Sequence, residues 1–306
     1  MMRLLIGTAG IVVAAALVWL LVPFPVSTPV VEEIGDAERG AYVFRMGGCA
    51  SCHTDSKNGG ALLAGGRALE TPFGTFYTSN LTPDPGTGIG GWTTGDFVQA
   101  MTKGLSPQGH DYYPSFPYTS YANMTNQDLA DLKAYLDTVE PVNNPVPPHA
   151  LNFPFNFRAL LKPWKAMFLR APGVSSDPEK SDAWNRGAYL VNGPGHCGEC
   201  HTPRNMLGAL DRSLALAGTR EGPDGDPVPN ITPHDDDGIG GWSTSDITFA
   251  LQTGILPDGD VFGGAMSEVV RDNTSHLTPE DRAAIAEYLL SLDPLTDAQP
   301  AQAEDV

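Results

Sequence analysis

A five-residue motif that occurs twice constrains this chain of 306 residues more than any other feature of its sequence. The copies read CASCH and CGECH, share the pattern C-x-x-C-H, and together contain all four cysteines. Two cysteines three positions apart reach the same side of one helical turn, and the histidine beside them can ligate a metal. This pattern is typical of c-type haem attachment, in which two thiols form thioethers with the vinyl groups and the imidazole binds iron.

The sequence therefore predicts two covalently bound haem c groups. The expected thioether residues are Cys49, Cys52, Cys197 and Cys200, and the expected histidine ligands of the two irons are His53 and His201. A disulfide, a zinc site or a thioredoxin-like redox pair would also use paired cysteines. Two copies of the motif that use every cysteine favour haem over these alternatives and leave no free thiol.

A longer internal repeat surrounds the motifs. Residues 88–96 read GIGGWTTGD, and residues 238–246, which lie 150 positions later, read GIGGWSTSD. The tetrapeptide RGAY also precedes each C-x-x-C-H motif. Repetition on this scale indicates the duplication of a whole domain. We expect the first domain at residues 36–140 and the second at residues 181–292.

Each copy of the repeat carries signals for the same three short helices. In the first copy, one helix begins near Asp36, a second ends at Gly104, and a third begins at the N-cap Thr125. In the second copy, the first and third helices begin near Ser181 and Thr278. The stretches between the helices are rich in Gly and Pro and show no strand alternation. Such a domain has few apolar layers of its own, so something must fill its centre.

The sequence opens with an apolar segment. Residues 4–22 are uncharged and long enough to cross a hydrocarbon core of about 30 Å. Their length favours an uncleaved anchor over a secretory signal peptide, and Arg3 ahead of them would direct the rest of the chain to the exported side. We assign residues 1–26 to this anchor or signal peptide and residues 27–35 to a tether. The predicted fold class is mainly α, with two tandem class I cytochrome c-like domains after an N-terminal transmembrane helix.

The sixth iron ligands are the other candidate site residues. Met266 follows the second helix of the second domain, and its thioether is the expected ligand there. The repeat places Phe116 at the matching position of the first domain, and a phenyl ring cannot ligate iron. We predict Met124 as the sixth ligand of the first haem, with His110 or an open coordination position as alternatives.

Charge is distributed unevenly along the chain. A net charge of −18 excludes the electrostatics of a nucleic-acid binder. Residues 181–292 carry a net charge of −11, which favours a basic electron-transfer partner. The linker at residues 141–180 is net positive and mixes aromatic with cationic side chains, so we expect it to pack across the two domains. Residues 293–306 form a predicted polar tail.

Four segments make the chain resemble the cytochrome c subunits of bacterial membrane-bound alcohol, gluconate and sorbitol dehydrogenases. They read RGAYLVNGPGHCGECHTPRN, NITPHDDDGIGGWS, YPSFPYTSYANMT and FPFNFRALLKPW. The resemblance implies a protein on the periplasmic side of the bacterial cytoplasmic membrane, held there by its N-terminal helix. Members of this family typically bind three haems, whereas this sequence carries two motifs, and it has Phe116 where the family often has a methionine ligand.

These features predict an electron-transfer protein. The resemblance implies that it carries electrons from a dehydrogenase catalytic subunit to an oxidase or another cytochrome of the respiratory chain. Neither domain shows a paired-carboxylate, nucleophile or nucleotide-binding motif, so we expect it not to be an enzyme on its own. The alternative is a dihaem enzyme, a peroxidase or small-molecule oxidase, that binds its substrate at an open first haem.

Overall fold

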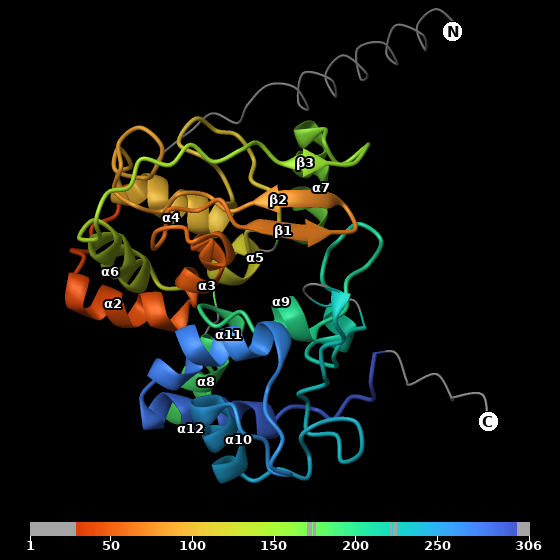
Figure 1. Ribbon diagram of the computed structural model, residues 1–306. Coiled ribbons are helices and arrows are strands. Elements are labelled where there is room, and N and C mark those ends of the chain that lie inside the picture. Colours follow the sequence, from red (N-terminus) through yellow and green to blue (C-terminus); the bar gives the residue numbers. More distant parts are fainter. Residues whose placement is uncertain (1–28, 170–172, 174–175, 221, 223–224, 299–306) are drawn as a thin grey trace, which may run out of the picture.

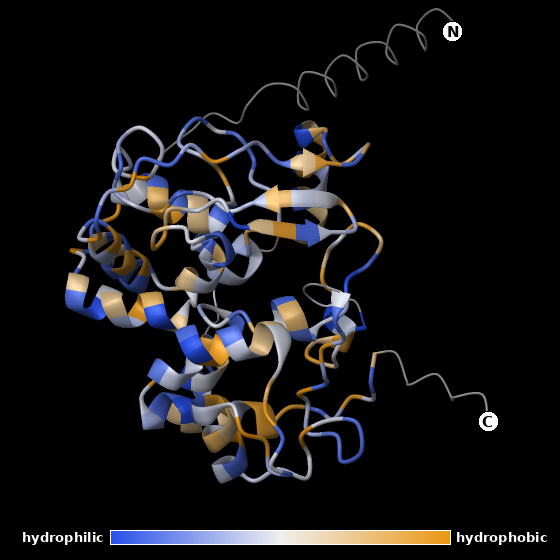
Figure 2. Ribbon diagram, viewed as in Figure 1, coloured by the Kyte–Doolittle hydropathy of each residue, from blue (hydrophilic) through white to orange (hydrophobic). Residues whose placement is uncertain are grey.

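The computed structural model describes residues 29–169, 173, 176–220, 222 and 225–298. Two helical units lie against each other, and the helices α3, α9 and α11 sit near the boundary between them (Figure 1). The buried apolar residues of both units form one connected cluster. Figure 2 shows the helices banded with hydrophilic and hydrophobic residues, as expected for helices that bury one face.

The helices of the two units correspond in order. The first unit contains α2 (Ala37–Met46), α3 (Cys49–His53), η1 (Ser56–Asn58), α4 (Thr94–Lys103), α5 (Tyr118–Tyr121) and α6 (Asn126–Leu136). The second contains α8 (Asp182–Asn192), α9 (Gly198–His201), η3 (Arg212–Leu214), α10 (Thr244–Thr253), α11 (Gly264–Asp272), η5 (Thr274–His276) and α12 (Pro279–Leu290).

The predicted helix ends are confirmed. Asp36, Ser181, Thr125 and Thr278 are the N-caps of α2, α8, α6 and α12, and the side chain of each accepts hydrogen bonds from backbone N–H groups of its helix. Gly104 ends α4 with a φ of 59°, in the left-handed region that glycine adopts without strain. These ends depend on interactions within one turn, which is why the sequence shows them.

In each unit two helices cross at a glycine of the RGAY segment, α2 with α6 in the first unit and α8 with α12 in the second. A Cβ atom on Gly40 would lie 1.9 Å from the carbonyl oxygen of Asp131 on α6. A Cβ atom on Gly187 would lie 2.0 Å from the carbonyl oxygen of Ala284 on α12. The absence of a side chain therefore allows the two helix backbones to touch in both units.

The linker packs across both units, as the sequence predicts. It contains β3 (Ala150–Leu151), η2 (Arg158–Leu160) and α7 (Leu161–Phe168). On α7, the buried Lys165 Nζ donates to the carbonyl oxygens of Lys103 and Gly104 and to Asp111 Oδ1, at 2.9, 2.7 and 2.7 Å. The neighbouring Trp164 donates its indole N–H to the carbonyl oxygen of Leu207 in the second unit, at 2.8 Å. These contacts fix α7 to both domains.

A small antiparallel sheet, which sequence reasoning missed, joins the linker to the first unit. Its strands are β1 (Ala68–Thr71), β2 (Gly74–Tyr77) and β3, in the order β1-β2-β3. The first two strands have four residues each and β3 has two. Strands this short are below the length at which an alternating pattern can be recognised.

The predicted fold class needs one correction. The mainly helical architecture is observed, but the expected N-terminal transmembrane helix is not supported. Among the described residues, no helix is long and apolar enough to cross a membrane. The longest of those helices, α12, has 12 residues, which corresponds to about 18 Å, against a hydrocarbon core of about 30 Å. Residues 4–22, on which the prediction rested, lie outside the described part of the chain.

Candidate haem sites

The two C-x-x-C-H motifs form matching single turns of helix. Each begins after a residue in the left-handed region, Gly48 with a φ of 57° and His196 with a φ of 39°. No disulfide joins the four cysteines, all of which lie in the described part of the chain. Burial raises the pKa of Cys49 and of Cys197 to about 12, so both thiols are neutral at physiological pH. A thioredoxin-like cysteine needs the opposite shift, toward the thiolate.

The motif histidines are oriented by equivalent backbone carbonyl groups. His53 Nδ1 lies 2.7 Å from the carbonyl oxygen of Ser79, and His201 Nδ1 lies 2.8 Å from that of Pro229. Burial lowers the pKa of both imidazoles, which favours the neutral form. With Nδ1 donating its proton to a carbonyl group, the lone pair of Nε2 is available to an iron atom.

These donor sets fit a c-type haem. Each contains two neutral thiols on one turn and one oriented neutral imidazole, and Cys49 and Cys197 both pack against the buried apolar cluster. In the part of the chain that the structure describes, no group of three or more His, Cys, Asp or Glu side chains could hold a metal ion. That the four cysteines form thioethers and the two histidines bind iron stays a prediction, with which this geometry is compatible.

Met266 lies in a different local structure from the one the sequence suggested. The Gly-rich stretch before it predicts a loop, but Met266 occupies the first turn of α11, whose N-cap is Gly263. The side chain is half-buried. Glycines at a helix start resemble a loop in sequence, which explains the difference. Its ligation of the second haem stays a prediction.

The candidates for the sixth iron ligand of the first haem differ in burial. Met124 is 7 % exposed and belongs to the apolar cluster, immediately before the N-cap of α6. His110 is exposed in a turn, where its backbone N–H donates to Ser106 Oγ. Phe116 packs among aromatic rings, with its centroid 5.8 Å from that of Tyr121. Met124 therefore remains the predicted ligand because its thioether lies in the apolar interior.

Sequence reasoning missed that both motif helices contact the opposite domain. Ser51, inside the first motif, donates its hydroxyl to Asp272 Oδ2 of the second domain at 2.9 Å. Glu199, at the same place in the second motif, accepts hydrogen bonds from Thr119 and Ser120 of the first domain at 3.0 and 2.7 Å. The Cys52 thiol also contributes to the raised pKa of Cys200, after burial and Glu199. The two haem attachment turns therefore meet at the domain interface.

Comparisons with known proteins identify the family of this chain. The sequence model of the Cytochrome c family matches residues 37–140. The chain is 47% identical over 288 residues to a "Diheme cytochrome c-type" protein of Cereibacter sphaeroides, covering 92% of this chain and 95% of that protein. It is 39% identical over 279 residues to a "Fructose dehydrogenase cytochrome subunit" of Gluconobacter japonicus, covering 90% of this chain and 55% of that subunit.

A third relative is the "Gluconate 2-dehydrogenase cytochrome c subunit" of Pantoea cypripedii, 38% identical over 273 residues, with 85% of this chain and 61% of that subunit covered. The chain thus spans nearly all of the first relative and more than half of the two dehydrogenase subunits. Its cofactor is covalently bound haem c, and its role is electron transfer rather than catalysis, as the sequence predicts. The chain belongs to the dihaem c-type cytochromes, the family that it shares with the cytochrome c subunits of these dehydrogenases.

Proposed function

We propose that this cytochrome accepts electrons from a dehydrogenase catalytic subunit and passes them to an oxidase or another cytochrome of the respiratory chain. Two of its relatives support a dehydrogenase as the electron donor, because they are named as cytochrome subunits of a fructose and a gluconate dehydrogenase. The observation that carries the proposal is the meeting of α3 and α9 at one interface, where Ser51 and Glu199 each contact the opposite domain. An electron can enter at one domain and leave at the other.

The residues of the chain hold and insulate the redox group. A bound haem c supplies reversible one-electron exchange at its iron. His53 and His201 are oriented for ligation through their Nδ1 hydrogen bonds. Met124 and Met266 are the residues that we propose would supply the remaining ligand to each iron. If both methionines bound iron, neither haem would keep an open position for a substrate, which would suit electron transfer.

We further place this activity on the periplasmic side of the bacterial cytoplasmic membrane, as the family resemblance implies. The second domain, at residues 181–292, has a net charge of −11. An acidic surface of this kind favours a basic partner and speeds the encounter at low salt.

The test uses the haem-loaded full chain and a purified dehydrogenase of the fructose, alcohol or gluconate class with its substrate. We expect both haems to become reduced, at a rate that falls as the salt concentration rises. Fractionation of cells that produce the full chain should recover it outside the cytoplasm. If no such dehydrogenase reduces the cytochrome and the cytochrome turns over peroxide rapidly, the protein is the alternative dihaem enzyme.

A further inference from the structure

The two RGAY tyrosines make equivalent hydrogen bonds in opposite directions across the domain interface. The Tyr42 hydroxyl, on α2 of the first domain, donates to Asp281 Oδ2 of the second domain at 2.7 Å. The same hydroxyl accepts a hydrogen bond from the backbone N–H of Thr278 at 3.0 Å. Tyr42 therefore caps the beginning of α12 from outside its own domain.

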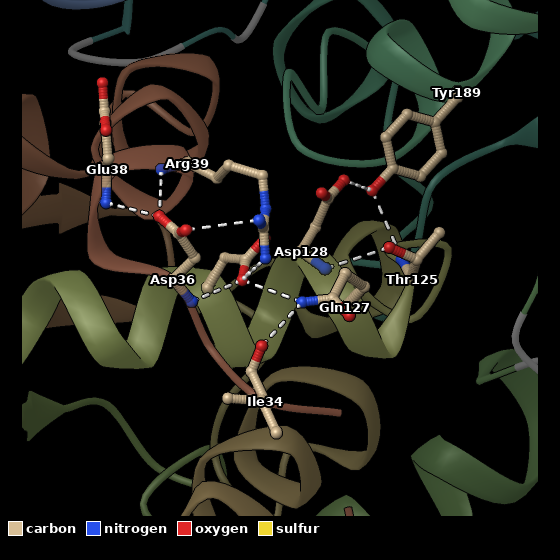
Figure 3. A network of polar contacts seen from close by, with 9 residues as sticks. Ile34, Asp36, Glu38, Arg39, Thr125, Gln127, Asp128 and Tyr189 are labelled. Carbon is tan, nitrogen blue, oxygen red and sulfur yellow. Dashed lines mark hydrogen bonds and ion pairs between the residues drawn. The ribbon is translucent and has the colours of Figure 1, made fainter. Parts of the chain in front are cut away.

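The Tyr189 hydroxyl, on α8 of the second domain, repeats this arrangement at the beginning of α6 in the first. It donates to Asp128 Oδ2 and accepts a hydrogen bond from the backbone N–H of Thr125 at 3.3 Å. Figure 3 shows the Tyr189 ring reaching the start of α6, where Asp128 and Thr125 meet its hydroxyl. Each domain thus places a tyrosine on the N-terminal turn of a helix in the other domain, Tyr42 on α12 and Tyr189 on α6.

Two asparagines 150 positions apart form a second reciprocal pair. Asn123 Nδ2 donates to the carbonyl oxygen of Asn192, at the end of α8, at 2.9 Å. Asn273 Nδ2 donates to the carbonyl oxygen of Met46, at the end of α2, at 2.7 Å. The interface therefore has approximate two-fold symmetry, like an isologous contact between two copies of one subunit.

The reciprocal contacts lie close to the haem attachment turns along the chain. Met46 and Asn192 end the helices that lead into the two motifs. Burial raises the pKa of Tyr42 and of Tyr189, so both hydroxyls stay protonated and can donate. A hydroxyl that donates to a carboxylate makes one of the stronger hydrogen bonds in proteins. The tyrosines therefore fix the two domains in one relative position near both motifs.

We propose that Tyr42 and Tyr189 are positioning residues that hold the haem-bearing turns α3 and α9 at a fixed separation and so set the rate of electron exchange between the two haems. The inference rests on the proposed electron-transfer function. In the exchange, one iron is oxidised as the other is reduced by the same electron, and no bond or proton moves. Electron tunnelling slows steeply with distance, so an interface that opens must slow it.

The experiment measures the exchange rate in the half-reduced, haem-loaded full chain by exchange NMR of the haem signals. The rate that does not depend on protein concentration is the intramolecular one. The test variant is the double substitution Tyr42→Phe and Tyr189→Phe, which keeps both rings. The matched control is Tyr135→Phe with Tyr288→Phe, the same chemical change on α6 and α12; the Tyr288 hydroxyl accepts a hydrogen bond from Asn192 within its own domain.

Loss of one hydrogen bond to a carboxylate shifts an equilibrium by about tenfold or more. Because the other contacts between the domains keep much of the protein in the closed form, the rate falls less than this equilibrium constant. We expect the test variant to lower the intramolecular rate by more than about twofold, while the absorption spectrum of each haem stays unchanged. The control should stay within about twofold of the unmodified protein. An unchanged rate in the test variant, or an equal fall in the control, would overturn the proposal.

A second comparison applies if the double variant does not fold. Asp128→Asn keeps an oxygen that can accept from Tyr189, whereas Asp128→Ala removes it. The proposal requires slower exchange in Asp128→Ala than in Asp128→Asn, and equal rates contradict it. Because a small-molecule reductant prepares the half-reduced state, this result does not depend on whether a dehydrogenase is the natural donor.

Discussion

The glycine of the RGAY segment offers the sharpest test of how each domain is built. In Gly40→Ala, the new Cβ atom would lie 1.9 Å from the carbonyl oxygen of Asp131 and 2.5 Å from its carbonyl carbon. Both atoms belong to the backbone of α6, so no side-chain rotation can relieve the overlap. Ordinary contact begins at 3.4 Å, and the helices α2 and α6 would have to separate by about 1.5 Å in a close-packed interior.

The expected magnitude follows from two opposing effects. Inserting a methyl group into a packed interior costs about 1–3 kcal/mol, and a backbone clash belongs at the upper end. Alanine gains about 1 kcal/mol over glycine inside a helix. The net loss is therefore about 2 kcal/mol, which lowers the Tm of a domain of about 100 residues by roughly 8–16 °C. Guanidinium and thermal unfolding of the haem-loaded protein, followed by circular dichroism, measure both quantities.

Gly91→Ala is the matched control, because a Cβ atom there would have no atom within 4 Å and its φ is not in the left-handed region. We expect it to leave the stability unchanged or to raise it by up to about 1 kcal/mol. The same contrast should recur in the second domain between Gly187→Ala and Gly241→Ala. A Gly40→Ala variant as stable as Gly91→Ala would refute the close helix crossing.

Three further predictions concern other parts of the molecule. Lys165→Met leaves the buried Asp111 carboxylate without its ion-pair partner, and should lower the free energy of unfolding by about 3–5 kcal/mol. Adding Asp111→Leu to this variant should restore most of the lost stability, and equal guanidinium midpoints for the single and double variants would contradict this. Met124→Leu and Met266→Leu should each abolish one of two sulfur-to-iron charge-transfer bands in the oxidised spectrum, and a variant that keeps both bands excludes its methionine as a ligand. Burial raises the pKa of Asp131, but the hydrogen bonds to its carboxylate outweigh burial and hold this pKa below 3.8. The ionised carboxylate therefore stabilises the fold fully above pH about 4, and this stabilisation is lost on further acidification. The difference in the free energy of unfolding between the unmodified protein and Asp131→Asn should narrow only below that pH.

Local features of the sequence predicted a large part of this protein. The spacing of Cys49, Cys52 and His53 defines a haem attachment turn because all three lie within one turn of helix. The caps at Thr125 and Gly104 act within one turn of backbone, and they appear where the sequence places them. The duplication of the domain was visible as well, because the repeat preserves these local signals in order.

The tertiary structure decided the features that depend on distant residues. Tyr42 and Asp281 are 239 positions apart, and nothing near either residue indicates that they form a hydrogen bond. The short strands of the small sheet, and the start of α11 at a glycine, depend on packing against other segments rather than on their own propensity. The sequence alone thus predicted two haem attachments and the residues that form them. Only the tertiary structure brought the two attachment turns together, because long-range contacts between complete domains fix their separation.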